Sequence, residues 1–115
     1  MRLPNAEQAV VAPRKLTDYL LAPQHPRGQA KAALFAQLGY DADRWRGLAD
    51  ALIAHAQRHA VVLRDETSFG TWYTLEGELA GPFGAEAGLR TVWFIDTGHR
   101  IPRFVTAYRL HARNP

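Results

Sequence analysis

The segment GLRTVWFID, residues 88–96, decides the fold of this 115-residue chain. Its large apolar side chains occupy both parities of an extended backbone: Leu89, Trp93 and Ile95 on one side, Val92 and Phe94 on the other. A strand that is apolar on both sides is typical of the interior of a sheet. The segment therefore predicts a sheet with a further strand on each of its flanks.

Three more runs with a period of two surround this segment. They are VVLRDET (61–67), TWYTLEGEL (71–79) and PRFVTAYRL (102–110). The connectors SFG, AGPFGAEA and TGHRI are short and rich in turn-forming residues, which favours antiparallel neighbours. We expect a four-stranded antiparallel β-meander over about residues 61–110.

The first half of the chain carries helical patterns. Pro13 suits the first position of a short helix that must end by Pro23, and a second helix is expected over about 28–38, followed by Gly39. A third helix has apolar residues at helical spacing from about residue 45 to 56, with Asp43 as its expected cap. These two or three helices, within about residues 13–59, should pack on one face of the sheet. The sequence predicts a single α+β domain over residues 1–115.

Composition limits the classes of function. At 47% hydrophobic residues the chain can bury a core, and the lack of cysteine excludes disulfides, thiolate zinc sites and a cysteine nucleophile. No stretch approaches the ~20 apolar residues of a membrane span, and the first residues lack the apolar region of a signal peptide. We expect a soluble cytoplasmic protein.

Charge is unevenly distributed along the chain, whose formal net charge is +3. Residues 61–88 carry one arginine and five carboxylates, whereas residues 89–115 carry five arginines and one aspartate. Such a bipolar chain favours a polyanion such as RNA at its basic flank and a basic partner at its acidic flank. An ordinary solvated surface explains the same charges equally well.

The segment HPRGQAK, residues 25–31, concentrates cationic and proton-transfer groups just before the second expected helix. Lys31 shares the buried stripe of Leu34, Phe35 and Leu38, and it lies at the helix end where the macrodipole disfavours a cation. A group nearby should compensate for this lysine.

Polar residues also alternate along the last expected strand. Arg103 and Arg109 share one parity, while Phe104, Thr106 and Tyr108 share the other. Charges on a terminal strand also protect a sheet edge against unwanted pairing, so the arginines alone do not indicate a site.

Other motifs are weak. His55 and His59 have a spacing that suits a metal, but no third ligand follows at motif spacing, and histidines in a last helical turn also suit the macrodipole. Asp96-Thr97-Gly98 is the beginning of a tight turn. The sequence therefore predicts neither a metal site nor a nucleotide fingerprint.

Longer motifs resemble a known family. The pattern L-x-D-Y-L-L-x-P-x-H-P-x-G-x-x-K-A-x-x-F-x-x-L-G-Y over residues 16–40, followed by T-V-W-F-I-D-x-G and P-R-F-V-T-A-Y, resembles an uncharacterised bacterial domain family found free-standing and as the C-terminal cargo of polymorphic toxins. The resemblance covers nearly the whole chain. The order of elements and the late W…P-R-x-x-T-x-Y segment are similar to the barnase, EndoU, colicin and RelE group of metal-independent ribonucleases, the BECR fold.

This resemblance implies a toxin domain that cleaves RNA by attack of a ribose 2′-hydroxyl on the adjacent phosphate, without metal or cofactor, and a cognate antitoxin or immunity protein as partner. His25 would be the general acid/base, with Lys31 and Arg103 as phosphate-stabilising cations. The substrate-binding residues would be Arg27, Arg90, Thr91, Trp93, Thr106 and Tyr108.

Two questions stay open at this level. Trp93 alternates with other apolar residues of an interior strand, which favours a core position over base stacking. In the rival function the domain is a non-catalytic protein- or nucleic-acid-binding module, in which His25 bonds backbone and Lys31 pairs with a carboxylate such as Asp96. Convergence of His25, Lys31 and Arg103 on one phosphate-sized space would favour the enzyme.

Overall fold

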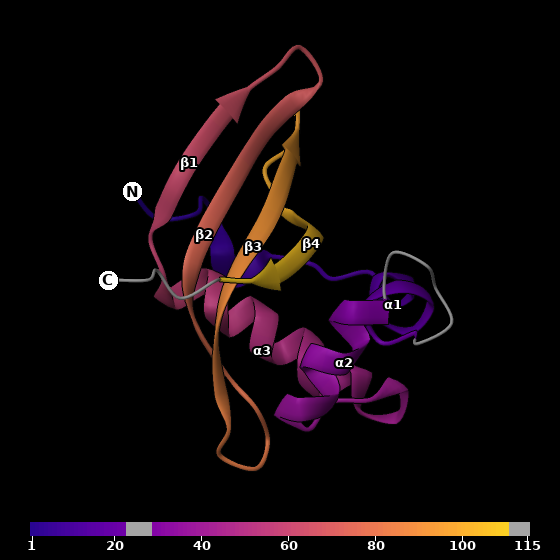
Figure 1. The fold of residues 1–115 in the computed structure, drawn as a ribbon. Helices are drawn as coiled ribbons and strands as arrows, with labels where there is room; N and C mark the ends of the chain where they lie inside the picture. The colour runs from indigo at the N-terminus through magenta and orange to yellow at the C-terminus, as the bar shows by residue number, and fades with distance from the viewer. Residues whose placement is uncertain (23–28, 111–115) are drawn as a thin grey trace.

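The computed structural model describes residues 1–22 and 29–110, and its sheet has the predicted form. Four antiparallel strands follow one another in the order β1-β2-β3-β4 (Figure 1). Their bounds are Val61–Glu66 for β1, Gly70–Ala80 for β2, Glu86–Asp96 for β3 and Arg103–Arg109 for β4. The meander and the interior position of β3 are confirmed.

The helices also lie where helical periodicity predicts them. They are α1 (Pro13–Lys15), which continues as the π-helical turn η2 (Leu16–Leu20), α2 (Gln29–Leu38) and α3 (Trp45–Arg58), with short 3-10 turns η1 (Ala6–Gln8) and η3 (Ala42–Arg44). Pro13 occupies the first turn of α1, and Gly39 ends α2 in the left-handed region with φ +102°. No helix in the described part of the chain is long and apolar enough to span a membrane.

The expected cap of the third helix is wrong by two residues. Asp41 is the capping residue, and its carboxylate accepts from the backbone N–H of Arg44 at 3.1 Å. Asp43 lies inside η3, and α3 begins only at Trp45. A 3-10 turn therefore precedes the α-helix and moves the cap towards the N-terminus.

The two faces of the sheet differ in what covers them. On the inner face, side chains of β2, β3 and β4 join apolar residues of the helices in one core, including Leu75, Leu89, Trp93, Phe104 and Ala107. On the outer face, the paired residues Thr74, Val92 and Thr106 are only partly buried, and none of the three belongs to this core. The fold class, helices on one face of an antiparallel sheet, is confirmed.

A β-bulge in β4 changes one expectation. Trp93 pairs with Phe104, but Val92 pairs with Thr106, so Val105 is the extra residue. Phe104 is therefore buried on the inner face, while Thr106 points to the outer face. The shared parity predicted for Phe104 and Thr106 is wrong because the bulge reverses the alternation.

Candidate functional site

Lys31 lies where α2, η2 and β4 meet. Its helical neighbours Leu34 and Phe35 are buried in the core, while Lys31 itself is partly exposed at the β4 border of the sheet. Its ammonium donates hydrogen bonds to Tyr19 Oη at 2.8 Å and to Thr106 Oγ1 at 2.9 Å. Lys31 therefore joins the helical layer to the outer face of the edge strand.

Hydroxyl oxygens and aromatic rings compensate for this lysine. Its Nζ lies 5.0 Å from the ring centroid of Tyr19 and 5.8 Å from that of Tyr108, within the range of cation–π attraction. None of the ion pairs among residues 1–22 and 29–110 includes Lys31. The pairing with Asp96 expected for a non-catalytic module is absent, because Asp96 pairs with Arg103.

The phenol of Tyr19 is electrostatically altered by this contact. Burial acts to raise its pKa, but hydrogen bonds from Lys31 and Thr106, together with the charges of Lys31 and Lys15, outweigh burial. Together these contributions lower the pKa of Tyr19 from its usual value. The phenolate of Tyr19 therefore forms more easily than that of an ordinary tyrosine.

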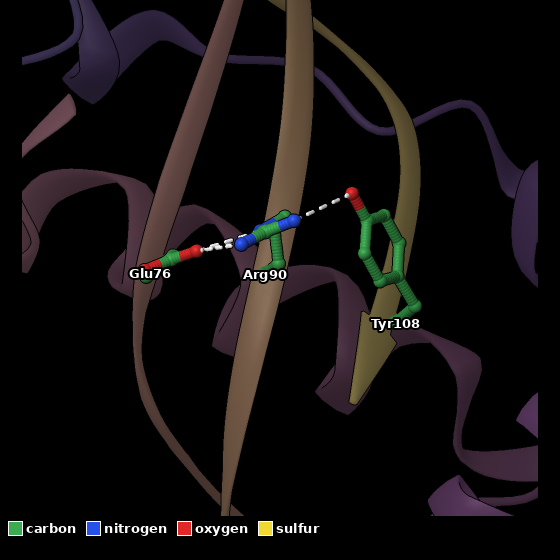
Figure 2. A network of polar contacts seen from close by, with 3 residues as sticks. All are labelled: Glu76, Arg90 and Tyr108. Carbon is green, nitrogen blue, oxygen red and sulfur yellow. Dashed lines mark hydrogen bonds and ion pairs between the residues drawn. The ribbon is translucent and has the colours of Figure 1, made fainter. Parts of the chain in front are cut away.

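A polar row of Glu76, Arg90 and Tyr108 crosses three strands (Figure 2). Arg90 on β3 donates through Nε to Glu76 Oε2 on β2 at 2.7 Å, and its Nη2 donates to the same oxygen. Its Nη1 donates to Tyr108 Oη on β4 at 3.4 Å. The hydroxyl of Tyr108 thus accepts from Arg90.

The two cations Lys31 and Arg90 flank one aromatic ring. The guanidinium of Arg90 lies 5.5 Å from the ring centroid of Tyr108, compared with 5.8 Å for Lys31 Nζ. The hydrogen bond to Tyr108, followed by that to Glu76, raises the pKa of Arg90. We call Lys31, Tyr19, Thr106, Tyr108 and Arg90 the β4-border cluster.

Arg103 belongs to a different part of the outer face. Its Nε donates to Asp96 Oδ2 at 3.0 Å, and its guanidinium lies 5.1 Å from the ring centroid of Phe94. The hydrogen bond from Arg103, more than its charge, lowers the pKa of Asp96. Arg103 shows no contact with Lys31 among the described residues, so these two predicted cations do not converge.

Thr91 and Trp93 lie on the inner face and are fully buried. Trp93 Nε1 donates to Thr91 Oγ1 at 3.0 Å, and Thr91 Oγ1 lies 3.2 Å from His55 Nδ1. His55 Nε2 lies 3.0 Å from the carbonyl of Gly77, so Nε2 carries the proton and Nδ1 accepts from Thr91. Every polar group of this network has a partner inside the core, out of reach of a ligand.

The structure thus separates the predicted site residues into groups. It brings together Lys31, Arg90, Thr106 and Tyr108, and it holds Thr91, Trp93 and Arg103 elsewhere. His25 and Arg27 lie outside the described residues. Sequence reasoning missed Tyr19; its phenol, within the same motif as Lys31, was the available signal.

The bipolar charge of the sequence becomes a gradient across the sheet. The carboxylates Asp65, Glu66, Glu76 and Glu78 lie on β1 and β2, whereas Arg103 and Arg109 lie on β4. Figure 1 shows β1 and β4 at opposite borders, with α1 beside β4. Lys31 is therefore at the basic border, where an anion is favoured.

Two other candidates carry no chemistry of this kind. The described residues contain no cluster of three metal-ligating side chains, and His55 is committed to Thr91 and Gly77. An apolar pocket of about 500 Å³ lies between α2 and the adjoining residues 40–42. Alanine methyl groups dominate its lining, so it offers no cation to a phosphate.

A solved structure is similar to this chain over most of its length. A chain of the "Contact-dependent growth inhibition toxin - immunity protein complex from Klebsiella pneumoniae 342" has a similar structure, with a TM-score of 0.72 at 20% sequence identity. The match covers 93% of this chain and 97% of that chain, and at this identity it concerns the fold. No curated protein matches the sequence.

The family comparison covers almost the whole sequence. The model of the family described as "Domain of unknown function (DUF6883)" matches residues 2–111. It spans both the helical half and the complete sheet, including every residue of the β4-border cluster. The chain belongs to this DUF6883 family.

Proposed function

We propose that this chain is a metal-independent ribonuclease toxin domain whose phosphate site is the β4-border cluster. The observation that supports this proposal most strongly is the partly buried ammonium of Lys31. It donates hydrogen bonds to two hydroxyls, and no described carboxylate is paired with it. An ammonium has three hydrogens, and the two bonds use two of them. The third hydrogen and the uncompensated charge suit a phosphate oxygen.

Proton transfer completes the proposed reaction. The ribose 2′-oxygen forms a bond to phosphorus while the bond from phosphorus to the 5′-oxygen breaks, which leaves a 2′,3′-cyclic phosphate. Tyr19, as the phenolate that the hydrogen bond and charge of Lys31 favour, accepts the 2′-hydroxyl proton. His25 remains our proposed donor to the departing 5′-oxygen, because an imidazole titrates near pH 6.5. Lys31 stabilises the charge that builds up on the phosphoryl oxygens.

The toxin context is part of the same proposal. The similar chain comes from a complex whose title names a growth inhibition toxin and an immunity protein. We infer that this domain, too, has a cognate protein that neutralises it, and that RNA is its target. Arg27, which precedes Lys31 by four residues, is proposed to add a second cation to the bound phosphate.

RNA cleavage in EDTA tests the proposal. Purified protein is incubated with total RNA, and the fragments and their terminal phosphates are compared for the wild type, Lys31→Met and Arg58→Gln. The Met variant keeps the apolar stem of Lys31, and Arg58 is an exposed cation at the end of α3 that serves as the matched control. Fragments with cyclic phosphate ends should fall by roughly 100-fold or more in Lys31→Met alone.

A non-catalytic module of the same fold is the alternative. It would bind RNA or a protein partner through the same cluster without breaking a bond. Intact RNA after incubation with correctly folded wild-type protein would favour this alternative. Cleavage that persists in Lys31→Met would contradict the assigned role of Lys31.

A further inference from the structure

A second functional element lies on the outer face, away from the β4-border cluster. We propose that Trp72 is a base-stacking platform for the nucleotide next to the one whose phosphate binds Lys31. This inference rests on the proposed function, which it extends from the reacting phosphate to the bound RNA strand.

Trp72 is exposed in a way that core aromatics are not. It lies near the beginning of β2, and 38% of its surface is accessible, whereas Trp93 is fully buried. The register pairs Trp72 with Phe94, and Phe94 with Arg103, so all three point to the outer face. An indole with one open side on an uncovered sheet is the arrangement on which nucleobases stack.

The indole is held in place from below. Its ring centroid lies 4.6 Å from that of Phe94 at an interplanar angle of 61°, and Phe94 is only 5% exposed. Gly70 allows the Phe94 ring to fit closely, because a Cβ at this glycine would lie 2.5 Å from Phe94 Cζ. Arg103, which Asp96 holds, covers another side of Phe94. The platform is therefore rigid before any ligand binds.

The charges around Trp72 indicate a base rather than a second phosphate. Asp65 is its direct cross-strand partner on β1, and Asp96 already neutralises Arg103. A phosphate would be repelled by Asp65, and Arg103 is already committed to Asp96, whereas a neutral base with exocyclic amino groups meets acceptors there. The basic border therefore takes the phosphate, and the acidic half of the face takes the base.

The spacing fits two neighbouring nucleotides. Thr106, Val92 and Thr74 form one cross-strand row, and Trp72 lies two residues beyond Thr74. With strands ~4.8 Å apart and ~3.4 Å per residue, Thr106 and Trp72 are roughly 12 Å apart. The base of the nucleotide bound at Lys31 does not extend that far, but the base of its neighbour does. The partly exposed Thr74 and Val92 provide an uncharged path between them.

Substrate length gives the test. A nucleoside 3′-(methyl phosphate), which has one phosphodiester but no neighbouring base, and an eight-nucleotide RNA are cleaved by the wild type, Trp72→Ala, Trp72→Phe and the control Trp45→Phe. Trp72→Ala should lower kcat/KM for the octanucleotide by roughly 5- to 100-fold, leave cleavage of the one-base ester unchanged, and be rescued by Trp72→Phe. Equal cleavage of the octanucleotide by wild type and Trp72→Ala would overturn the platform and leave this surface to a protein partner.

Fluorescence separates failure of the platform from failure of the proposed function. A 2′-O-methyl octanucleotide cannot be cleaved, and its binding should quench wild-type tryptophan emission much more than that of Trp72→Phe. If the wild type cleaves no RNA but this difference is present, the cleavage proposal fails and the platform stands. If the difference is absent, the platform is wrong even where RNA is cleaved.

Discussion

Two polar networks in this domain each combine a threonine, an aromatic residue and a basic residue, but they lie on opposite faces of the sheet. Thr91 and Trp93 face inward with His55, and each of their polar groups is paired within the core. Thr106 and Tyr108 face outward beside Lys31, whose charge has no described carboxylate partner. The difference shows that the direction of a strand residue decides whether its polar groups are enclosed in the core or accessible to a ligand.

Of the changes that test this comparison, removal of the Trp93 indole from the inner network should have the largest effect. Trp93→Ala deletes the largest fully buried side chain and leaves Thr91 without its donor. We expect a loss of about 3–5 kcal/mol in the free energy of unfolding. Urea denaturation measures this loss. Trp72→Ala is the matched control, and a loss as large as that of Trp93→Ala in this control would contradict the assignment of the two faces.

The pH dependence of the free energy of unfolding tests the inner network through His55. Burial lowers the pKa of His55, so the folded protein keeps this imidazole neutral while the unfolded chain binds a proton below about pH 6.5. Stability should therefore be fully present above that pH and fall as the pH drops from about 6.5 towards the folded-state pKa. Denaturation midpoints between pH 7.5 and 5 measure the slope.

A control variant identifies the group responsible for this slope. His55→Gln should flatten the dependence, whereas His99→Gln, at an exposed turn, should leave it as in the wild type. An unchanged slope in His55→Gln would exclude the buried imidazole as its source.

On the outer side, the titration of Tyr19 gives the smallest of these effects. Because the hydrogen bond and charge of Lys31 favour the phenolate, Lys31→Met should raise the pKa of Tyr19. Tyrosinate absorbance against pH measures this change, and Tyr19→Phe identifies the component that belongs to this residue. A Tyr19 pKa that is the same in the wild type and Lys31→Met would show that the two side chains are not coupled.

Much of the fold was predictable because periodicity reports burial. The strand pattern of residues 88–96 placed β3 in the interior, and the helical stripe that contains Leu34 and Phe35 placed α2 on the core. Lys31 was predicted as an unusual residue for the same reason. Local backbone irregularity was not predictable, since a 3-10 turn moved the cap to Asp41 and one bulge at Val105 reversed the alternation along β4.

The candidate site was predictable only in part, because its residues come from separate elements. Lys31 was found from its own pattern, and the family resemblance supplied Thr106 and Tyr108. Strand register alone decides that Arg90 lies beside Tyr108 and that Thr91 does not. Tyr19 was missed because a tyrosine on an apolar helix face has the same pattern whether its hydroxyl is free or bonded to a lysine twelve residues away. Sequence spacing carries no information on that contact.

The most direct measurement compares Thr91→Val with Thr106→Val in both stability and RNA cleavage. Thr91→Val leaves Trp93 Nε1 and His55 Nδ1 unpaired, so it should cost about 2 kcal/mol or more in stability and preserve the cleavage rate per folded molecule. Thr106→Val removes one bond to Lys31 and should cost less than about 1 kcal/mol in stability while slowing cleavage by roughly 10-fold. The reverse pattern, with cleavage lost in Thr91→Val and kept in Thr106→Val, would contradict the outer-face site.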